Sequence, residues 1–238
     1  GHHFDSNGVR IHYTDEGAGE PVVLVHGLAA NADLNWRRSG IIRMLSENFR
    51  VIAFDLRGHG LSGQPTEPRY YGLEMVEDIV RLMDHLEIES AHVAGYSLGG
   101  FLTLKLLAEH PERVRSAALC AAGWQDPEDG ADIPNPYRPP PTAMRPVRAA
   151  DVFNWVRNWG ERQVINREAV DAMRETFDTL GVKRTTLETN TTPALCLIGK
   201  EDGLLPLARA LRAHMARLEY AEIDGVGHMG MLFTGEFR

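Results

Sequence analysis

A serine held between glycines is the residue of this chain best suited to act as a nucleophile. Ser97 lies in the sequence AGYSLGG at residues 94–100, which follows a short apolar run and opens an apolar stretch of helical length. A G-x-S-x-G turn between a strand and a helix strains the serine backbone, and its neighbours must be small because the two backbones pass closely. The hydroxyl then stands at the sheet edge, beside the positive end of a helix dipole. The pattern predicts a nucleophile at Ser97; the alternative is a glycine-rich turn with an incidental serine.

Two later loops carry the base and the acid that a serine nucleophile needs. A serine hydroxyl is a poor nucleophile at its ordinary pKa, so a base must accept its proton and a third group must orient that base. After such a turn the expected chain order is Ser, then Asp or Glu, then His. Asp202 follows an apolar run at residues 194–198, and His228 follows another at residues 220–223. Because loops at the carboxyl ends of parallel strands meet at one sheet edge, we expect Ser97, Asp202 and His228 to converge.

Other acidic and histidine side chains compete for these roles. Glu201 adjoins Asp202, and a second place for an acid follows the apolar run that ends near residue 121, at Asp126 and Glu128. Asp202 and His228 follow the last two predicted strands in the required order after the Ser97 turn, and this favours Asp202. The other candidate bases fall on predicted helices, where a surface position is the simpler interpretation: His85, His110 and His214.

Backbone amides complete the predicted site. Acyl transfer needs hydrogen-bond donors directed at the oxyanion of the tetrahedral intermediate. One is the N–H of Leu98, directly after the nucleophile, and the second is the N–H of Leu28 in the sequence HGLA at residues 26–29. The expected substrate pocket is nearly all apolar, which favours a neutral substrate of small to medium size, and its side chains are Leu28, Tyr96, Trp124, Leu204 and Met229.

Short apolar runs alternate with helical patterns along most of the chain. Runs that are apolar throughout are typical of parallel strands covered on both faces, and they lie at residues 22–25, 51–54, 92–94, 114–121, 194–198 and 220–223. A more alternating pair, around Phe4 and at residues 9–13, is expected to form an antiparallel edge. Helices are predicted between the strands, two of them amphipathic and the middle one apolar nearly all round, at residues 73–86, 98–110 and 204–218.

This alternation breaks between residues 123 and 188. The first part, residues 127–146, is rich in proline, which excludes regular helix and central strand. Helical patterns return at residues 153–159, whose aromatic side chains are expected to be buried, and at residues 170–180. We expect a small helical cap at residues 123–188, inserted over the strand ends of a core formed by residues 1–122 and 189–238.

Composition limits the classes of protein and partner. The chain has 238 residues, 43% of them hydrophobic, which suits one domain with a substantial core. Its formal net charge is −8 and its basic residues are scattered, which argues against nucleic acid and membrane surfaces as partners. No apolar run approaches the roughly 20 residues that span a bilayer, and the first residues lack a secretory pattern.

The two cysteines bear on the cellular compartment. Cys120 and Cys196 each lie in an apolar, strand-like run, and two thiols cannot form a disulfide framework. Free core thiols and a cytoplasmic location are the simpler interpretation, although a pairing between the two stays open. The opening sequence GHH is assigned no role.

These motifs together resemble the α/β-hydrolase superfamily, and within it the single-domain, capped, esterase-like branch. The likeness runs from about residue 9 to about residue 231, and it includes the sequence DLRGHGLS at residues 55–62, which is expected to brace the site. Family members usually carry a further helix after the catalytic histidine, whereas this sequence ends ten residues past His228. Either that helix is missing, or the cap or a partner covers its surface; such an exposed face would favour a homo-oligomer.

The resemblance implies a serine hydrolase, and the residues favour a carboxylesterase that forms an acyl-enzyme and requires no metal or organic cofactor. Serine rather than aspartate at position 97 argues against haloalkane dehalogenases and epoxide hydrolases, whose intermediates in this fold are carboxylate esters. Enol-lactonases and carbon–carbon bond hydrolases share the triad and stay open as alternatives. A non-enzyme alternative is a small-molecule receptor on the same fold, although such members typically lose a triad residue and none is missing here.

Overall fold

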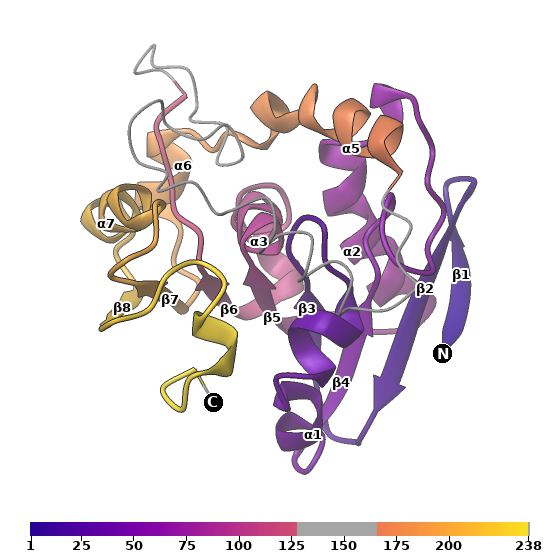
Figure 1. Cartoon of the computed structure of the whole chain (residues 1–238), viewed down its shortest axis with the longest axis horizontal. Helices are drawn as coiled ribbons and strands as arrows, with labels where there is room; N and C mark the ends of the chain where they lie inside the picture. The colour runs from indigo at the N-terminus through magenta and orange to yellow at the C-terminus, as the bar shows by residue number, and fades with distance from the viewer. Residues whose placement is uncertain (128–165, 238) are drawn as a thin grey trace, which may run out of the picture.

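A mostly parallel sheet forms the centre of the computed structural model, which describes residues 1–127 and 166–237. Its eight strands follow the order β1-β2-β4-β3-β5-β6-β7-β8 (Figure 1). Their bounds are His2–Ser6 (β1), Val9–Glu16 (β2), Glu20–Val25 (β3), Phe49–Phe54 (β4), Ala91–Tyr96 (β5), Val114–Cys120 (β6), Ala194–Gly199 (β7) and Leu218–Ile223 (β8).

The two N-terminal strands form the antiparallel edge that their alternating pattern predicts. β1 pairs antiparallel with β2, β2 pairs antiparallel with β4, and all later pairings are parallel. Each predicted apolar run coincides with or overlaps an observed strand, and β3 and β4 each bury four consecutive residues at their carboxyl ends. A strand covered on both faces has no solvent side, so the alternation of polar residues is lost. The predicted α/β architecture is confirmed.

Helices lie on both sides of this sheet. The longer ones are Ile41–Leu45 (α1), Leu73–His85 (α2), Leu98–Glu109 (α3), Arg167–Arg174 (α5), Arg184–Thr189 (α6) and Leu205–His214 (α7). Figure 1 shows α2 and α3 on one side and α1 on the other. Single turns complete the described elements: a π-type turn at Asp33–Arg37 (η1) and 3-10 turns at Pro68–Tyr70 (η2), Pro111–Arg113 (η3), Phe177–Leu180 (η4) and Met231–Phe233 (η5).

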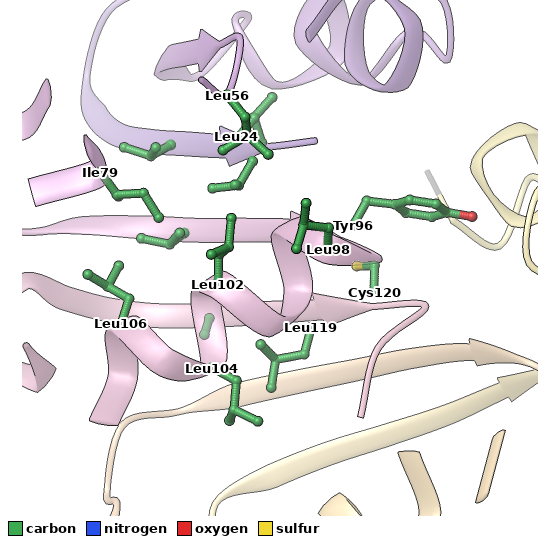
Figure 2. Close-up of a cluster of buried hydrophobic side chains, with 14 of the residues drawn as sticks. Leu24, Leu56, Ile79, Tyr96, Leu98, Leu102, Leu104, Leu106, Leu119 and Cys120 are labelled. Carbon is green, nitrogen blue, oxygen red and sulfur yellow. The ribbon is translucent and has the colours of Figure 1, made fainter. Parts of the chain in front are cut away.

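Helix α3 is buried on nearly every side, as its apolar sequence predicts. It packs against β5 and β6, and Figure 2 shows Leu102 and Leu104 projecting from opposite sides of the helix. Both leucines are buried, as is Leu106 one turn later. Because a close-packed interior resists displacement, this packing holds the first turn of α3, and Ser97 before it, in one position relative to the strands.

The boundary between α7 and β8 differs from its prediction. Residues 204–218 carry one helical pattern, but α7 ends at His214 and β8 begins at Leu218. Leu218 has the spacing to continue the apolar stripe of the helix, yet it pairs with Ala194 on β7. The hydrogen bonds between β8 and β7 satisfy the backbone groups of the whole strand. Here they determine the structure more strongly than the helical spacing of the apolar residues.

Most of the predicted cap, residues 128–165, lies outside the described residues, including the aromatic side chains at 153–159. The described part of the insertion after that gap contains α5, η4 and α6. The side chain of Asn166, directly before α5, caps this helix by accepting the N–H of Glu168 and Ala169. Cys120 and Cys196 are buried and free. Within the two described ranges, every helix is too short or too polar to cross a bilayer.

A buried ion pair braces the loop that follows β4. The guanidinium of Arg57 donates to both carboxylate oxygens of Asp78 on α2, at 2.7 Å and 2.6 Å, and both side chains are fully enclosed. Asp78 also accepts a hydrogen bond from the hydroxyl of Ser6, and Arg57 donates to the carbonyl of Tyr70 at 2.7 Å. The edge strand, the loop at residues 55–62 and α2 therefore meet at one pair of charges.

Removing one partner of this pair is expected to cost far more stability than removing both. Asp78→Leu removes the bidentate partner of the enclosed Arg57 guanidinium and leaves only the more distant Glu74 carboxylate, 3.8 Å away. It should lower the free energy of unfolding by about 3–5 kcal/mol. The double variant Arg57→Met/Asp78→Leu leaves no buried charge and should recover at least half of that loss. Urea unfolding of the wild type, the single variants and the double variant measures the difference. A double variant no more stable than the weaker single variant would contradict this expectation.

Candidate active site

The turn between β5 and α3 holds Ser97 in a strained conformation. Its backbone has φ 54° and ψ −115°, a region that is costly for a residue with a side chain. A Cβ at Gly95 would collide with the carbonyl oxygen of Gly99, and a Cβ at Gly99 would collide with that of Val25. The N–H of Ser97 donates to the carbonyl of Cys120 at 2.8 Å. The turn is therefore fixed by its glycines and anchored to β6.

The structure brings Ser97, His228 and Asp202 together at the carboxyl edge of the sheet. His228 Nε2 lies 2.9 Å from Ser97 Oγ, and His228 Nδ1 lies 2.8 Å from Asp202 Oδ2. Because a carboxylate only accepts, Nδ1 carries the hydrogen of the neutral imidazole and Nε2 can accept the serine proton. The other oxygen of Asp202 accepts the N–H of Leu204 at 2.9 Å. The competing acid, Asp126, instead pairs with Arg184 at 2.7 Å.

The loop after β3 is held through its backbone amides. Three of its N–H groups donate to side chains: Gly27 to Asn35 Oδ1 at 2.8 Å, Ala29 to His59 Nε2 at 3.2 Å and Ala32 to Asp55 Oδ1 at 2.9 Å. Within the described chain, the amides of Leu28 and Leu98 donate to no protein group. These two predicted oxyanion donors, beside Gly27 and beside Ser97, are therefore available to a ligand.

Two buried histidines connect this loop to the segment after β4. His26 Nε2 accepts the N–H of Leu56 at 2.9 Å, His59 Nε2 accepts that of Ala29, and the rings meet edge to face at 5.1 Å. A ring nitrogen that accepts from an N–H carries no proton, so both imidazoles are neutral. Burial, which removes the hydration of the charged form, lowers the pKa of both rings, that of His59 to about 3.

A pocket opens beside Ser97 and His228. Its described lining is mainly apolar and includes Leu28, Leu34, Tyr96, Met229, Leu232 and Phe233. Met229 and Phe233 are 54% and 50% exposed, so they form its rim. Among the described lining residues there is no Lys, Arg, Asp or Glu side chain. Such a lining suits an uncharged ligand.

Known proteins share this fold and about a third or less of the aligned residues. Residues 20–159 match a family model described as the alpha/beta hydrolase fold. A 2-hydroxymuconate semialdehyde hydrolase of Pseudomonas sp. (strain CF600) is 31% identical over 86% of this chain and 78% of that protein. The chain belongs to the α/β-hydrolase family. It is a hydrolase, as the resemblance in its motifs implied.

Further relatives of this α/β-hydrolase differ in the reaction that their names describe. A solved 2-hydroxy-6-oxo-6-phenylhexa-2,4-dienoate hydrolase from Rhodococcus sp. strain RHA1 superposes with a TM-score of 0.77 at 28% identity, over 98% of this chain and 93% of that one. Bifunctional epoxide hydrolase 2 of Rattus norvegicus is 30% identical over 71% of this chain but only 29% of its own length. The family and the hydrolase class are shared, whereas the bond that is cleaved varies.

Two of the predicted pocket residues, Trp124 and Leu204, lie outside the described pocket lining. Trp124 is buried against His214, and its indole N–H donates to the carbonyl of Val182 at 2.7 Å, so it packs inside the fold. Leu204 is buried beside Asp202 and does not reach the pocket lining. Tyr96 does line the pocket, but its hydroxyl donates to the backbone carbonyl of His228. Strand direction alone does not reveal which way the chain turns after β6. For this reason the sequence analysis placed Trp124 in the pocket, which is wrong for the described structure.

The sequence patterns did not reveal several residues of the site. Asn35 anchors Gly27, and Trp36 and Phe237 pack against the Tyr96 ring at centroid distances of 6.4 Å and 6.1 Å. Asn35 and Trp36 lie in the single turn η1, and Phe237 lies in a turn beyond η5, so no periodic pattern marks them. The available signal was the adjacent pair Asn35 and Trp36, shortly after the loop at residues 26–32. Polar and aromatic residues at that place must face either solvent or the site.

Acidification is expected to destabilise the fold through His59. Its pKa is about 3 in the folded chain against an ordinary value of 6.5. Between these values the unfolded chain binds a proton that the folded chain does not, so stability falls as the pH falls. This group alone should remove up to about 1.4 kcal/mol of unfolding free energy per pH unit.

Urea unfolding from about pH 7.5 to about pH 4.5 tests this slope. His59→Gln keeps an acceptor for the Ala29 N–H but cannot titrate, so it should flatten the slope. The control His2→Gln, on the exposed edge strand, should leave the slope unchanged. An identical slope in the wild type and His59→Gln would rule out His59 as its source.

Proposed function

We propose that this hydrolase cleaves carboxylic esters of small to medium, mainly apolar substrates through an acyl-enzyme on Ser97. The observation that carries the proposal is the single imidazole that contacts both Ser97 Oγ and the Asp202 carboxylate, beside a pocket whose described lining has no Lys, Arg, Asp or Glu side chain. Asp202 is 5% exposed, so its attraction for the imidazolium is poorly screened by solvent.

The reaction follows from these contacts in two halves. Ser97 Oγ attacks the ester carbonyl carbon while His228 Nε2 takes the hydroxyl proton, and the amides of Leu28 and Leu98 donate to the oxyanion. As the tetrahedral intermediate collapses, the imidazolium returns that proton to the departing alkoxide oxygen and the alcohol leaves. Water then attacks the acyl carbon, His228 takes and returns a proton in the same way, and the carboxylic acid and free Ser97 result.

The described part of the pocket lining favours an uncharged ester over the dienoate in the name of the Rhodococcus relative. A dienoate carries a carboxylate, and burying that charge requires a cationic partner. The described lining contains no Lys or Arg side chain to provide one. Cleavage of a carbon–carbon bond also leaves a carbanion, a poorer leaving group than the alkoxide of an ester.

Carbon–carbon bond hydrolysis is the second candidate, because the similarity to the 2-hydroxymuconate semialdehyde hydrolase spans most of both chains. Enol-lactone hydrolysis needs the same acyl transfer as ester hydrolysis. For the epoxide hydrolases the match covers only 29% of their length, and serine stands here at the nucleophile position.

Loss of the nucleophile or of the acid is expected to remove esterase activity. With p-nitrophenyl esters from acetate to palmitate, Ser97→Ala should abolish turnover, and Asp202→Asn should lower kcat by roughly four orders of magnitude. The matched variant Asp126→Asn should leave kcat within about twofold, because Asp126 pairs with Arg184 and not with His228. A meta-cleavage dienoate and an enol-lactone are measured beside the esters.

The substrate panel separates the candidate functions. Steady ester turnover that depends on Ser97, and exceeds dienoate turnover, supports the carboxylesterase. Faster turnover of the dienoate overturns the ester proposal in favour of carbon–carbon bond hydrolysis. Tight ligand binding without turnover of any substrate identifies a receptor.

The phenol of Tyr96 is expected to support catalysis through the position of His228. Its hydroxyl donates to the His228 carbonyl, and Figure 2 shows it pointing away from the core leucines. Tyr96→Phe removes one hydrogen bond and should lower kcat roughly three- to twelvefold with little change in KM. The control Tyr13→Phe loses a phenol contact to His85 at the far edge and should leave kcat unchanged. An unaltered kcat in Tyr96→Phe would show that packing alone positions the histidine.

A further inference from the structure

Asn35 supplies a polar side chain to the mainly apolar described lining of the pocket. It lies in the single turn η1, 5% exposed, and lines the pocket together with Leu34 and Ser97. Its Oδ1 accepts the N–H of Gly27 at 2.8 Å. The position that a Cβ on Gly27 would occupy lies 3.2 Å from Ser97 Cβ and 3.6 Å from Asn35 Oδ1. The carboxamide is therefore close to the reacting serine.

The orientation of this carboxamide follows from its partner. A backbone N–H can only donate, so the carbonyl oxygen of Asn35 must face Gly27 and its NH2 group must face the other way. The usual ambiguity between the oxygen and nitrogen of an Asn side chain does not arise here.

The NH2 group of Asn35 has no protein partner in the described chain. The fully enclosed side-chain atoms that lack a partner among the described residues are Thr14 Oγ1, Trp36 Nε1 and Gln125 Oε1. Asn35 Nδ2 is not one of them, so it borders accessible space, and the space that Asn35 lines is the pocket. An amide kept in an apolar pocket with a free donor suits a ligand that provides the acceptor.

The other polar groups of the described lining are already engaged. Ser97 and His228 bond to each other, the Tyr96 hydroxyl donates to the His228 carbonyl, and the Ala29 N–H donates to His59. The Leu28 amide is assigned to the oxyanion. Asn35 is thus the side chain of this lining that retains a free N–H donor.

We propose that Asn35 determines specificity by donating a hydrogen bond from Nδ2 to a second oxygen of the substrate, close to the scissile carbonyl. The inference rests on the proposed ester hydrolysis and narrows its substrate class. The preferred acyl esters carry an ether, keto or hydroxyl oxygen within a few bonds of the ester carbonyl, and simple alkanoyl esters are the poorer substrates.

An isosteric pair of esters isolates this contact. p-Nitrophenyl 3-methoxypropanoate differs from p-nitrophenyl pentanoate only in an oxygen that replaces one CH2 group. For each variant we take the kcat/KM of the methoxy ester divided by that of the pentanoate, and compare this ratio with the wild-type ratio. The comparison removes the difference in intrinsic reactivity between the two esters. Asn35→Asp keeps an acceptor for Gly27 and loses the donor, and Asn35→Leu loses both without adding charge. In both variants this ratio should fall roughly three- to tenfold, because only the methoxy ester loses a hydrogen bond.

Asn31→Asp provides the matched control. Its carboxamide accepts the N–H of Leu34 at 2.8 Å in the same segment, and it does not line the pocket. The same charge change there should leave the substrate ratio as in the wild type. A fall in the ratio for Asn31→Asp equal to that for Asn35→Asp would assign the effect to charge and overturn the proposal.

The outcomes separate this inference from the proposed function. If Asn35→Asp and Asn35→Leu slow both esters equally, the donor serves the oxyanion or the loop, and the specificity role is wrong although the esterase stands. If the wild type cleaves neither ester, the proposed function fails. Calorimetric dissociation constants of both esters with Ser97→Ala then still decide the inference: adding Asn35→Leu must weaken binding of the methoxy ester selectively, and equal weakening overturns it.

Discussion

The hydrogen bond between His228 and Ser97 joins residues 131 positions apart in the chain, and it forms only because three strands end at one edge of the sheet. Ser97 follows β5, Asp202 follows β7 and His228 follows β8, with β6 between the first two. Parallel pairing sets the spacing of these loops, so the geometry of the triad is a property of the whole sheet. The strained turn at Ser97 is tolerated because α3 is packed on nearly every side.

The loop after β3, at residues 26–32, shows how buried polar groups can order a segment that has no regular structure. Neighbouring backbone amides of this loop donate to Asn35, His59 and Asp55, and the amide of Leu28 is left for a ligand. Neutral imidazoles suit this purpose because they accept at one nitrogen and donate at the other. The cost is their loss of hydration, which lowers the pKa of His59 to about 3. Stability at neutral pH and sensitivity to acid therefore arise from the same contacts.

Local signals predicted the parts of the molecule that local physics determines. Apolar runs marked the parallel strands, and the glycines around Ser97 marked a turn that tolerates no larger side chain. Chain order and position after strands led to Asp202 and His228, which the structure places beside Ser97. Trp124 was misplaced because the path of the chain after β6 depends on distant packing against His214 and Val182. Asn35 was missed because one hydrogen bond to Gly27 gives it its role, and no periodic pattern records that bond.

Chemistry and substrate choice are carried by different parts of this fold. In the proposed reaction, the triad and the two free amides act on the carbonyl that any acyl substrate shares, so they do not by themselves select among esters. Discrimination must come from groups that contact the rest of the substrate. In the described lining these are apolar side chains and one oriented amide, with no Lys or Arg side chain. An anionic substrate would lose its hydration there without compensation, whereas an uncharged oxygen could exchange a hydrogen bond to water for one to Asn35. On the proposed function, the described lining should distinguish substrates by charge first and by the position of an acceptor second.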